Sequence, residues 1–314
     1  MESLVATMLA LAALAGGGRQ ATPPPPPVPL RRLVGERLFV RFSGRTPSAA
    51  FLARVRRGEV GGVVLFGDNA STPGRVRLIV RRLDAAASAG GWPAPLVGID
   101  QEGGIVKRLP SLPPGRSAPQ LGARGSAAAA RSEGRATGRA LGALGVDVDF
   151  APVVDVPSVK GSFIAPRAFG RDPAKVAKLG GAFARGLQDG GVAGTMKHFP
   201  GLGAAPANTD LAQAVVHAPR SVLERGLAPY EKTPARLVML ATAVYPAYQR
   251  GVPAAFSHRI VTGILRERLG FAGVVVTDDL ETPAVRAYTS PAEGAARTLL
   301  AGADMALVVS SEAG

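Results

Sequence analysis

The chain has no cysteine among its 314 residues, which excludes disulfide bonds, thiolate metal ligands and cysteine nucleophiles. It has only three histidines and one tryptophan. The histidines, at positions 198, 217 and 258, do not have the spacing of a metal site or of a catalytic triad. There is no GxSxG nucleophile elbow, no GxGxxG dinucleotide motif and no phosphate-binding P-loop. The chemistry that remains belongs to carboxylates, a Lys-His pair and arginines, so we expect no metal and no cofactor.

Acidic residues are scarce relative to basic ones. The chain has 37 Lys and Arg against 23 Asp and Glu, which gives a formal charge of +14. A basic surface attracts anionic polymers, but here the arginines are spread along the chain and no basic stretch carries interleaved aromatic residues. We interpret the excess as a solvated arginine-rich surface and expect no nucleic-acid partner.

The first 28 residues differ in composition from the rest. Residues 1–15, MESLVATMLALAALA, form an apolar run too short for a comfortable membrane span, and a proline-rich stretch follows. This is typical of a signal peptide's hydrophobic region followed by a stiff spacer, although no Lys or Arg precedes it; a misassigned start or a frayed helix is the alternative. We expect a signal-like segment and linker over 1–28, one domain over 29–314, and an extracytoplasmic protein without a stable membrane span in its mature form.

From Leu30 onward, short apolar runs alternate with longer segments of helical period, the pattern of repeated β-α units. The predicted strands cover residues 37–43, 61–67, 95–100, 146–156, 192–199, 237–246, 273–279 and 305–310. Two of the predicted helices begin at Thr72 and Asp172, each an N-cap followed by proline. Strands continuous in Val, Ile and Leu are buried on both faces, so eight such units predict an α/β fold, a (β/α)8 TIM-type barrel. The chain stops a few residues after the eighth strand, so either the last helix is missing or the sequence is truncated.

Polar residues gather at the C-terminal ends of the predicted strands, which form the active-site face of such a barrel. They are Asp100, Gln101, Glu102, Asp155, Lys197, His198, Thr242, Tyr245, Asp278 and Asp279. Burying an unpaired charge is costly, so this set predicts a polar ligand site rather than packing. Strand alternation places Asp278 and Asp279 on opposite faces, so only one of them should point into the site. Paired carboxylates with hydrogen-bonding groups are the equipment of a glycosidase.

Five segments resemble, in the same order, the motifs of glycoside hydrolase family 3, specifically its single-domain β-N-acetylhexosaminidase branch. They are GIDQEGGIVKR (98–108), DFAPVVDV (149–156), PRAFGRDP (166–173), KHFPGLG (197–203) and GVVVTDDLE (273–281). The resemblance extends from about Leu33 to the end of the chain. It implies a retaining hydrolase that releases terminal β-linked N-acetylglucosamine. Together with export, it suggests peptidoglycan fragments as the substrate, and we expect the protein to act as a monomer.

The same resemblance assigns roles to individual residues. It implies that Asp278 is the catalytic nucleophile and forms a glycosyl-enzyme intermediate. The residues that it implies for holding the sugar are Asp100, Arg108, Arg167, Lys197 and His198. The lysine and the two arginines are expected to lower the pKa of Asp278 and keep this carboxylate ionised.

The sequence departs from the family in the loop after KHFPG. There the family's hexosaminidases usually run to Asp-Ser-His, and the His, paired with the Asp two residues before it, is the acid/base. This chain has Asn208, Thr209 and Asp210 at those places. In one interpretation, Asp210 is a carboxylic general acid, kept protonated with the help of Asp278 nearby. In a second, the protein is a catalytically impaired sugar-binding pseudoenzyme, and in a third Asp210 merely caps a helix over residues 211–216.

We adopt the first interpretation because the Asn at 208 fits it. A carboxylic acid, unlike an imidazolium, needs no second anion beside it. Hydrolysis is also favoured over transfer to phosphate, since an ionised Asp210 would repel that anion. For the substrate, a β-glucosidase or β-xylosidase of the same family is the alternative, because these enzymes share the Lys-His pair and the nucleophile.

Overall fold

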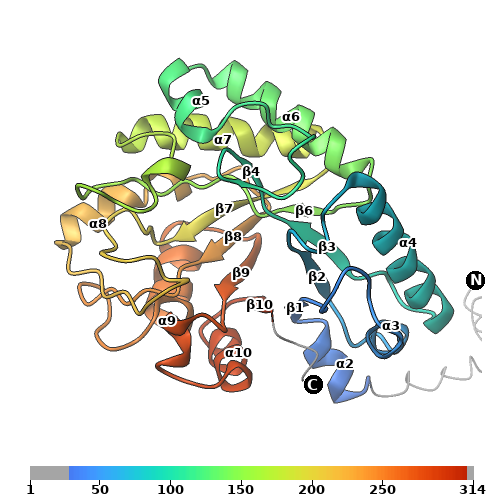
Figure 1. Cartoon of the computed structure of the whole chain (residues 1–314). Coiled ribbons are helices and arrows are strands. Elements are labelled where there is room, and N and C mark those ends of the chain that lie inside the picture. Colours follow the sequence, from blue (N-terminus) through green and yellow to red (C-terminus); the bar gives the residue numbers. More distant parts are fainter. Residues whose placement is uncertain (1–27, 310–314) are drawn as a thin grey trace, which may run out of the picture.

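The computed structural model describes residues 28–309, so the signal-like residues 1–27 and residues 310–314 lie outside the described part. Within it, eight parallel strands form a closed barrel surrounded by helices (Figure 1). The strands are β1 (Leu38–Val40), β2 (Gly62–Leu65), β3 (Leu96–Ile99), β6 (Val148–Asp149), β7 (Ala193–Phe199), β8 (Leu237–Leu240), β9 (Val274–Asp279) and β10 (Met305–Val308). Strand β1 pairs with β10, with Leu38 beside Ala306, which closes the barrel. The predicted barrel is confirmed, and each predicted strand is present in shorter form.

Helices connect the strands and cover the outside of the barrel (Figure 1). They are α2 (Leu30–Gly35), α3 (Ala49–Arg56), α4 (Pro73–Gly90), α5 (Ala118–Arg124), α6 (Ala127–Gly142), α7 (Pro173–Asp189), α8 (Arg220–Gly226), α9 (Pro283–Arg286), α10 (Pro291–Leu300) and a π-helical segment, η4 (Arg259–Arg268). As predicted, Thr72 caps α4 and Asp172 caps α7, each through a side-chain oxygen that accepts a first-turn amide. Over residues 28–309, no helix combines the length and hydropathy that crossing a membrane requires.

The centre of the barrel is filled by apolar side chains. Its cluster of buried residues is Phe39, Val64, Val148, Phe150, Leu237, Met239, Val276, Met305 and Leu307. The rings of Phe39 and Phe150 meet edge to face, with centroids 5.4 Å apart. Gly98 on β3 makes room for them, because a Cβ there would lie 2.7 Å from the Phe150 ring. Since the barrel is packed rather than hollow, a ligand site has to lie above this layer, at one end of the strands.

Helices α6 and α7 pack with their backbones in close contact. A Cβ added to Gly138 on α6 would lie 2.4 Å from the carbonyl oxygen of Leu187, and one added to Gly186 on α7 would lie 2.2 Å from that of Arg131. Larger residues would therefore push the two helices apart. Helix α7 leads directly into β7, so this contact also helps to set the position of the KHFPG segment.

One element near the barrel mouth was not predicted: an antiparallel hairpin of β4 (Gln101–Gly103) and β5 (Val106–Lys107) that follows β3. The buried Gln101 side chain accepts a hydrogen bond from the Leu109 amide and donates to the carbonyl oxygens of Leu109 and Pro113. The prediction that Gln101 serves the ligand site is therefore wrong, because its polar atoms stabilise the hairpin. The hairpin returns the chain toward Asp100, where it places Arg108.

Candidate active site

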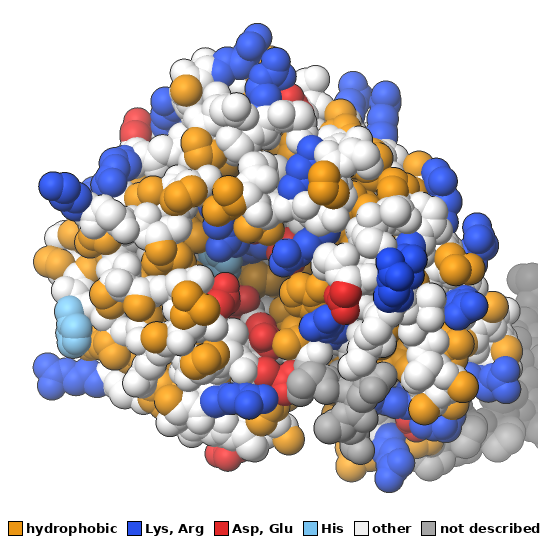
Figure 2. Space-filling view, in the orientation of Figure 1, with side chains coloured by type: hydrophobic (Ala, Val, Ile, Leu, Met, Phe, Trp, Pro, Cys, Tyr) orange, Lys and Arg blue, Asp and Glu red, His pale blue; other side chains and the backbone are white. Residues whose placement is uncertain are grey.

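A cavity of about 360 Å³ opens at the C-terminal ends of the barrel strands. Figure 2 shows the hollow near the centre of this face, with acidic and basic side chains around it. Every residue expected to hold the sugar or to react with it contributes to the lining, namely Asp100, Arg108, Arg167, Lys197, His198, Asp210 and Asp278. The volume lies in the range of small-molecule sites, about 300–1,000 Å³. The tertiary structure thus brings together in one cavity residues from five separate parts of the sequence.

The KHFPG segment forms the end of β7 and the turn that follows it. Lys197 and His198 are joined by a cis peptide bond, and both side chains line the cavity. The turn is held from behind, where the hydroxyl of Tyr245 donates to the carbonyl oxygen of Gly201 at 3.0 Å. Tyr245, which was predicted at the rim of the site, is fully buried beneath this turn. Thr242, predicted there too, is likewise buried, at 1% exposure.

Asp155 fixes the orientation of His198. One carboxylate oxygen of Asp155 lies 2.7 Å from Nδ1 of His198, and the other accepts the Leu202 amide at 2.6 Å. Asp155 is itself 1% exposed, so it pairs with the histidine out of contact with solvent. Because Nδ1 is occupied, Nε2 is the ring nitrogen left for a ligand.

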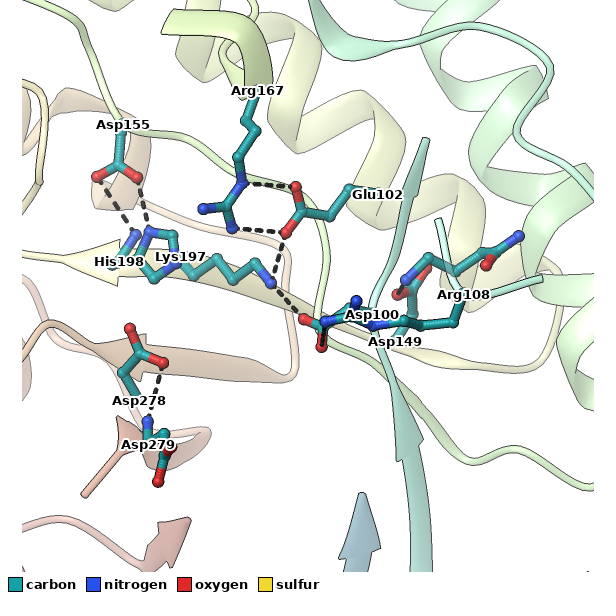
Figure 3. Close-up of polar contacts among 11 residues, drawn as sticks. Asp100, Glu102, Arg108, Asp149, Asp155, Arg167, Lys197, His198, Asp278 and Asp279 are labelled. Carbon is teal, nitrogen blue, oxygen red and sulfur yellow. Dashed lines mark hydrogen bonds and ion pairs between the residues drawn. The ribbon is translucent and has the colours of Figure 1, made fainter. Parts of the chain in front are cut away.

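The other cavity cations are paired with two carboxylates, Asp100 and Glu102 (Figure 3). Nζ of Lys197 lies 2.7 Å from each of them. Arg167 makes two hydrogen bonds to Glu102, at 2.9 and 2.7 Å, and Arg108 lies 3.4 Å from Asp100. Burial alone would raise the pKa of both carboxyls, but the attraction of the surrounding cations outweighs it and holds each pKa below its ordinary value. Both groups are therefore carboxylates at neutral pH.

Asp278 and Asp279 end β9 at the other side of the cavity. The carboxylate of Asp278 points toward His198 and Lys197, whereas that of Asp279 points away from them (Figure 3). Asp278 accepts the amide of Asp279 at 2.8 Å, and Asp279 accepts the amide of Glu281 at 2.9 Å. Both aspartates line the cavity, so the prediction that only one of them would face the site is wrong. Alternation still separates the two side chains, since only Asp278 is directed at the Lys-His pair.

Burial raises the pKa of Asp278, contrary to our expectation that nearby cations would lower it. The carboxylate of Asp210 adds to the rise, while His198 and Lys197 act in the opposite direction. The expectation failed because the cost of burying the carboxylate exceeds the attraction that the nearby cations exert on it. Burial also raises the pKa of Asp279, to about 7, with a further contribution from Asp278.

The loop after β7 places residues 208–210 along the cavity. The side-chain oxygen of Asn208 accepts the Asp210 amide at 3.1 Å, a local turn typical of asparagine. Residues 211–216 form no helix, and Val215 instead makes an isolated parallel bridge with Val244. The interpretation of Asp210 as a helix cap is therefore wrong. Its side chain is exposed while it lines the cavity, which places it at the mouth.

Three aromatic residues of the cavity were missed from the sequence: Phe66, Phe163 and Phe150, which also packs in the barrel centre. Phe66 follows β2 directly, and the guanidinium carbons of Arg41 and Arg108 lie 5.1 and 5.3 Å from its ring centroid. An aromatic residue at the C-terminal end of a predicted strand was the signal that could have found it. Phe163 lies in a long loop without such a signal.

A half-buried carboxylate, a second carboxylate at the mouth and a set of hydrogen-bonding cations suit reaction at a sugar-like ligand. In the described part of the chain, no three His, Asp or Glu side chains are arranged to hold a metal ion. The fold and the cavity together define a barrel enzyme whose cavity is lined by carboxylates. The chain also matches the model of the glycosyl hydrolase family 3 N-terminal domain over residues 31–313. It belongs to this family of glycosidases, whose substrates are carbohydrates.

Several known proteins are similar to the chain along most of its length. A β-hexosaminidase of Nitrosomonas eutropha is 35% identical over 282 residues, which cover 86% of this chain and 80% of that protein. A protein of Arthroderma benhamiae described as an uncharacterized secreted glycosyl hydrolase is 32% identical, with 87% and 80% covered.

Solved structures agree with this assignment. A glycoside hydrolase family 3 β-N-acetylglucosaminidase from Paenibacillus sp. superposes with a TM-score of 0.85 at 36% identity, covering 90% of this chain. This chain spans only 55% of that protein. NagZ from Neisseria gonorrhoeae, in complex with N-trifluoroacetyl-D-glucosamine, superposes with a TM-score of 0.79 at 28% identity, covering 88% of this chain and 82% of the other.

Proposed function

We propose that this protein is a retaining β-N-acetylglucosaminidase with Asp278 as its nucleophile. The observation that carries the proposal is the half-buried carboxylate of Asp278, directed at His198 and Lys197 inside a cavity of suitable size. The names of the relatives and of the neighbouring structures support the choice of sugar. A carboxylate oxygen of Asp278 attacks the anomeric carbon as the bond to the leaving oxygen breaks. Water then displaces the carboxylate, and the two inversions give net retention.

Asp210 is the proposed proton donor to the leaving oxygen. It lies at the cavity mouth, where the leaving group would depart, and it is close enough to raise the pKa of Asp278. In the first step Asp210 gives its proton to the leaving oxygen, and in the second it takes one from the attacking water. Two carboxyls would then share the work, as in most retaining glycosidases.

The remaining polar residues of the cavity are proposed to bind the hydroxyl groups of the sugar. The carboxylate of Asp100 accepts hydrogen bonds, whereas Arg108, Arg167 and Lys197 donate them. His198 offers Nε2, because Asp155 occupies its Nδ1. The aromatic rings of Phe66 and Phe163 give the cavity its apolar surface.

For the natural substrate, we infer peptidoglycan fragments with terminal β-linked N-acetylglucosamine, hydrolysed outside the cytoplasm. The apolar run in residues 1–15 and the relative described as secreted support export. We also propose that the protein acts as a monomer, since the residues that we assign to sugar binding and hydrolysis all belong to one chain.

The test is the hydrolysis of aryl glycosides by the parent protein and two variants. We expect turnover of nitrophenyl β-N-acetylglucosaminide by the parent and none by Asp278→Asn. Asp210→Asn should lower kcat by about 10²–10⁴-fold for poor leaving groups and much less for dinitrophenolate, which needs no proton.

Each competing function predicts a different result in the same assay. A β-glucosidase or β-xylosidase would prefer the corresponding nitrophenyl glycoside from a panel. A pseudoenzyme would bind N-acetylglucosamine in calorimetry without cleaving any member of the panel. If Asp210→Asn cleaves a poor-leaving-group substrate at the parent rate, Asp210 is not the acid.

A further inference from the structure

We propose that Glu102 is a positioning residue, which holds Arg167 and Lys197 in one fixed arrangement for binding of the sugar. This inference rests on the proposed function of the cavity, and it gives an individual role to a residue that the sequence placed only within the polar set at the strand ends. The side chain of Glu102 is 5% exposed and lies between the two cations rather than at the cavity mouth (Figure 3).

The carboxylate of Glu102, on the β4–β5 hairpin, contacts two segments that are distant in the sequence. Arg167, in the 3-10 turn η1 (Ala165–Arg167), donates from Nε to Oε2 of Glu102 at 2.9 Å and from Nη2 to Oε1 at 2.7 Å. Nζ of Lys197, on β7, lies 2.7 Å from the same Oε1. A two-point arginine–carboxylate pair fixes both distance and plane, so Glu102 on the β4–β5 hairpin determines where Arg167 presents its remaining donors.

The same carboxylate sets the net charge opposite Asp278. Three cations, Lys197, Arg167 and Arg108, face two carboxylates, Asp100 and Glu102, so the group carries one net positive charge. Loss of the charge on Glu102 would double that excess. Because Lys197 already acts to lower the pKa of Asp278, a larger excess of positive charge should lower this pKa further.

Glu102 is unsuited to proton transfer. Both of its oxygens accept hydrogen bonds from cations, and Lys197 and Arg167 hold its pKa below the ordinary value in spite of burial. A group that stays ionised and engaged cannot serve as an acid in the resting site. Its effect on the reaction must therefore pass through the two residues that it holds.

Two variants separate the effect of the charge of Glu102 from the effect of its side-chain length. Glu102→Gln keeps the shape but removes the charge, and Glu102→Asp keeps the charge but is one methylene shorter. With nitrophenyl β-N-acetylglucosaminide as the substrate, we expect Glu102→Gln to raise KM at least tenfold, to change kcat less, and to move the acidic limb of the pH profile to lower pH. Glu102→Asp should leave that limb at the parent position while KM stays raised.

The matched control is Glu133→Gln. Glu133 also pairs with an arginine, Arg116, at 2.7 Å, but on α6 and away from the cavity. Its replacement should leave KM and the pH profile unchanged. If Glu102 is purely structural, its replacement will lower the melting temperature and the folded fraction. KM will then stay within twofold of the parent value and the acidic limb will stay at the parent position. This result would overturn the proposal.

Calorimetric titration with N-acetylglucosamine tests Glu102 independently of turnover. We expect Kd to rise at least tenfold in Glu102→Gln and also to rise in Glu102→Asp, which remains a test if the first variant does not fold. A parent that binds the sugar without cleaving glycosides would refute the hydrolase proposal, while a weaker titration of the variants would still support the role of Glu102. Unchanged Kd values, or a parent that does not bind the sugar, would overturn the inference.

Discussion

Asp100, Glu102 and Asp149 are all largely withdrawn from solvent, and they differ in charge because their neighbours differ. Asp100 and Glu102 stay ionised because Lys197 and the arginines contact them. Asp149, on β6, lacks such a contact, and one of its oxygens is buried without a hydrogen-bond partner. The other accepts the Gln101 amide at 2.9 Å. Burial therefore dominates and raises the pKa of Asp149 to about 8.

This raised pKa makes a prediction about stability and pH. The folded chain keeps the proton on Asp149 up to about pH 8, whereas the unfolded chain releases it near its ordinary pKa of 3.8. The stability that the neutral form contributes is thus complete below 3.8 and is lost as pH rises toward 8, by up to about 1.4 kcal/mol per pH unit. Asp149→Asn cannot ionise and still accepts the Gln101 amide, so its free energy of unfolding relative to the parent should increase over this range.

The measurement is denaturant unfolding of both proteins at several pH values between 5 and 8. Asp149→Ala is the second variant, because it removes the hydrogen bond together with the charge and should be less stable than Asp149→Asn throughout. A difference between parent and Asp149→Asn that stays constant with pH would contradict the raised pKa.

At the level of elements, the β4–β5 hairpin and the α6–α7 pair do most to position the site. The hairpin places Glu102 and Arg108 beside Asp100, and Gln101 stabilises its return through three hydrogen bonds. Helix α7, which packs closely against α6, leads into β7, and β7 carries Lys197. Both elements therefore act on the same group of charged residues.

The α6–α7 contact gives a prediction with an internal control. Gly138→Ala would place its Cβ 2.4 Å from a backbone oxygen of α7, which cannot move without shifting the helix. We expect a loss of about 1–3 kcal/mol in the free energy of unfolding. Gly142→Ala, in the last turn of the same helix, has its nearest neighbour at 3.6 Å and should be neutral or stabilising because Ala favours helix. Equal effects of the two substitutions in thermal unfolding would contradict the tight contact.

For the molecule as a whole, we propose that one chain is sufficient for activity, because the residues assigned to the reaction all belong to it. Light scattering coupled to size-exclusion chromatography should therefore give the mass of a single chain. Activity per mole, followed with nitrophenyl β-N-acetylglucosaminide, should stay constant on dilution. A dimer that loses activity as it dissociates would show that a second chain contributes to the site.

The elements that could be predicted are those with local signals. Val, Ile and Leu runs marked the barrel strands, and Thr72 and Asp172 marked two helix starts. The hairpin was not predicted because its strands, QEG and VK, are too short to show the alternation of a strand. The helix considered over residues 211–216 is absent, and Val215 instead forms a long-range bridge with Val244. In the site, the sequence indicated which polar residues would come together at the cavity, and it did not indicate how they pair.

The sequence by itself determined the barrel and the family, because strand periodicity is local and the motif residues stand at the strand ends. It also placed Lys197, His198 and Asp278 at one rim before any coordinates. Only the tertiary structure decided that Glu102 and Asp100 neutralise the cations, that Asp155 takes Nδ1 of His198, and that burial raises the pKa of Asp278. The physical reason is that charge interactions depend on distance and burial in three dimensions, which the order of residues along a chain does not contain.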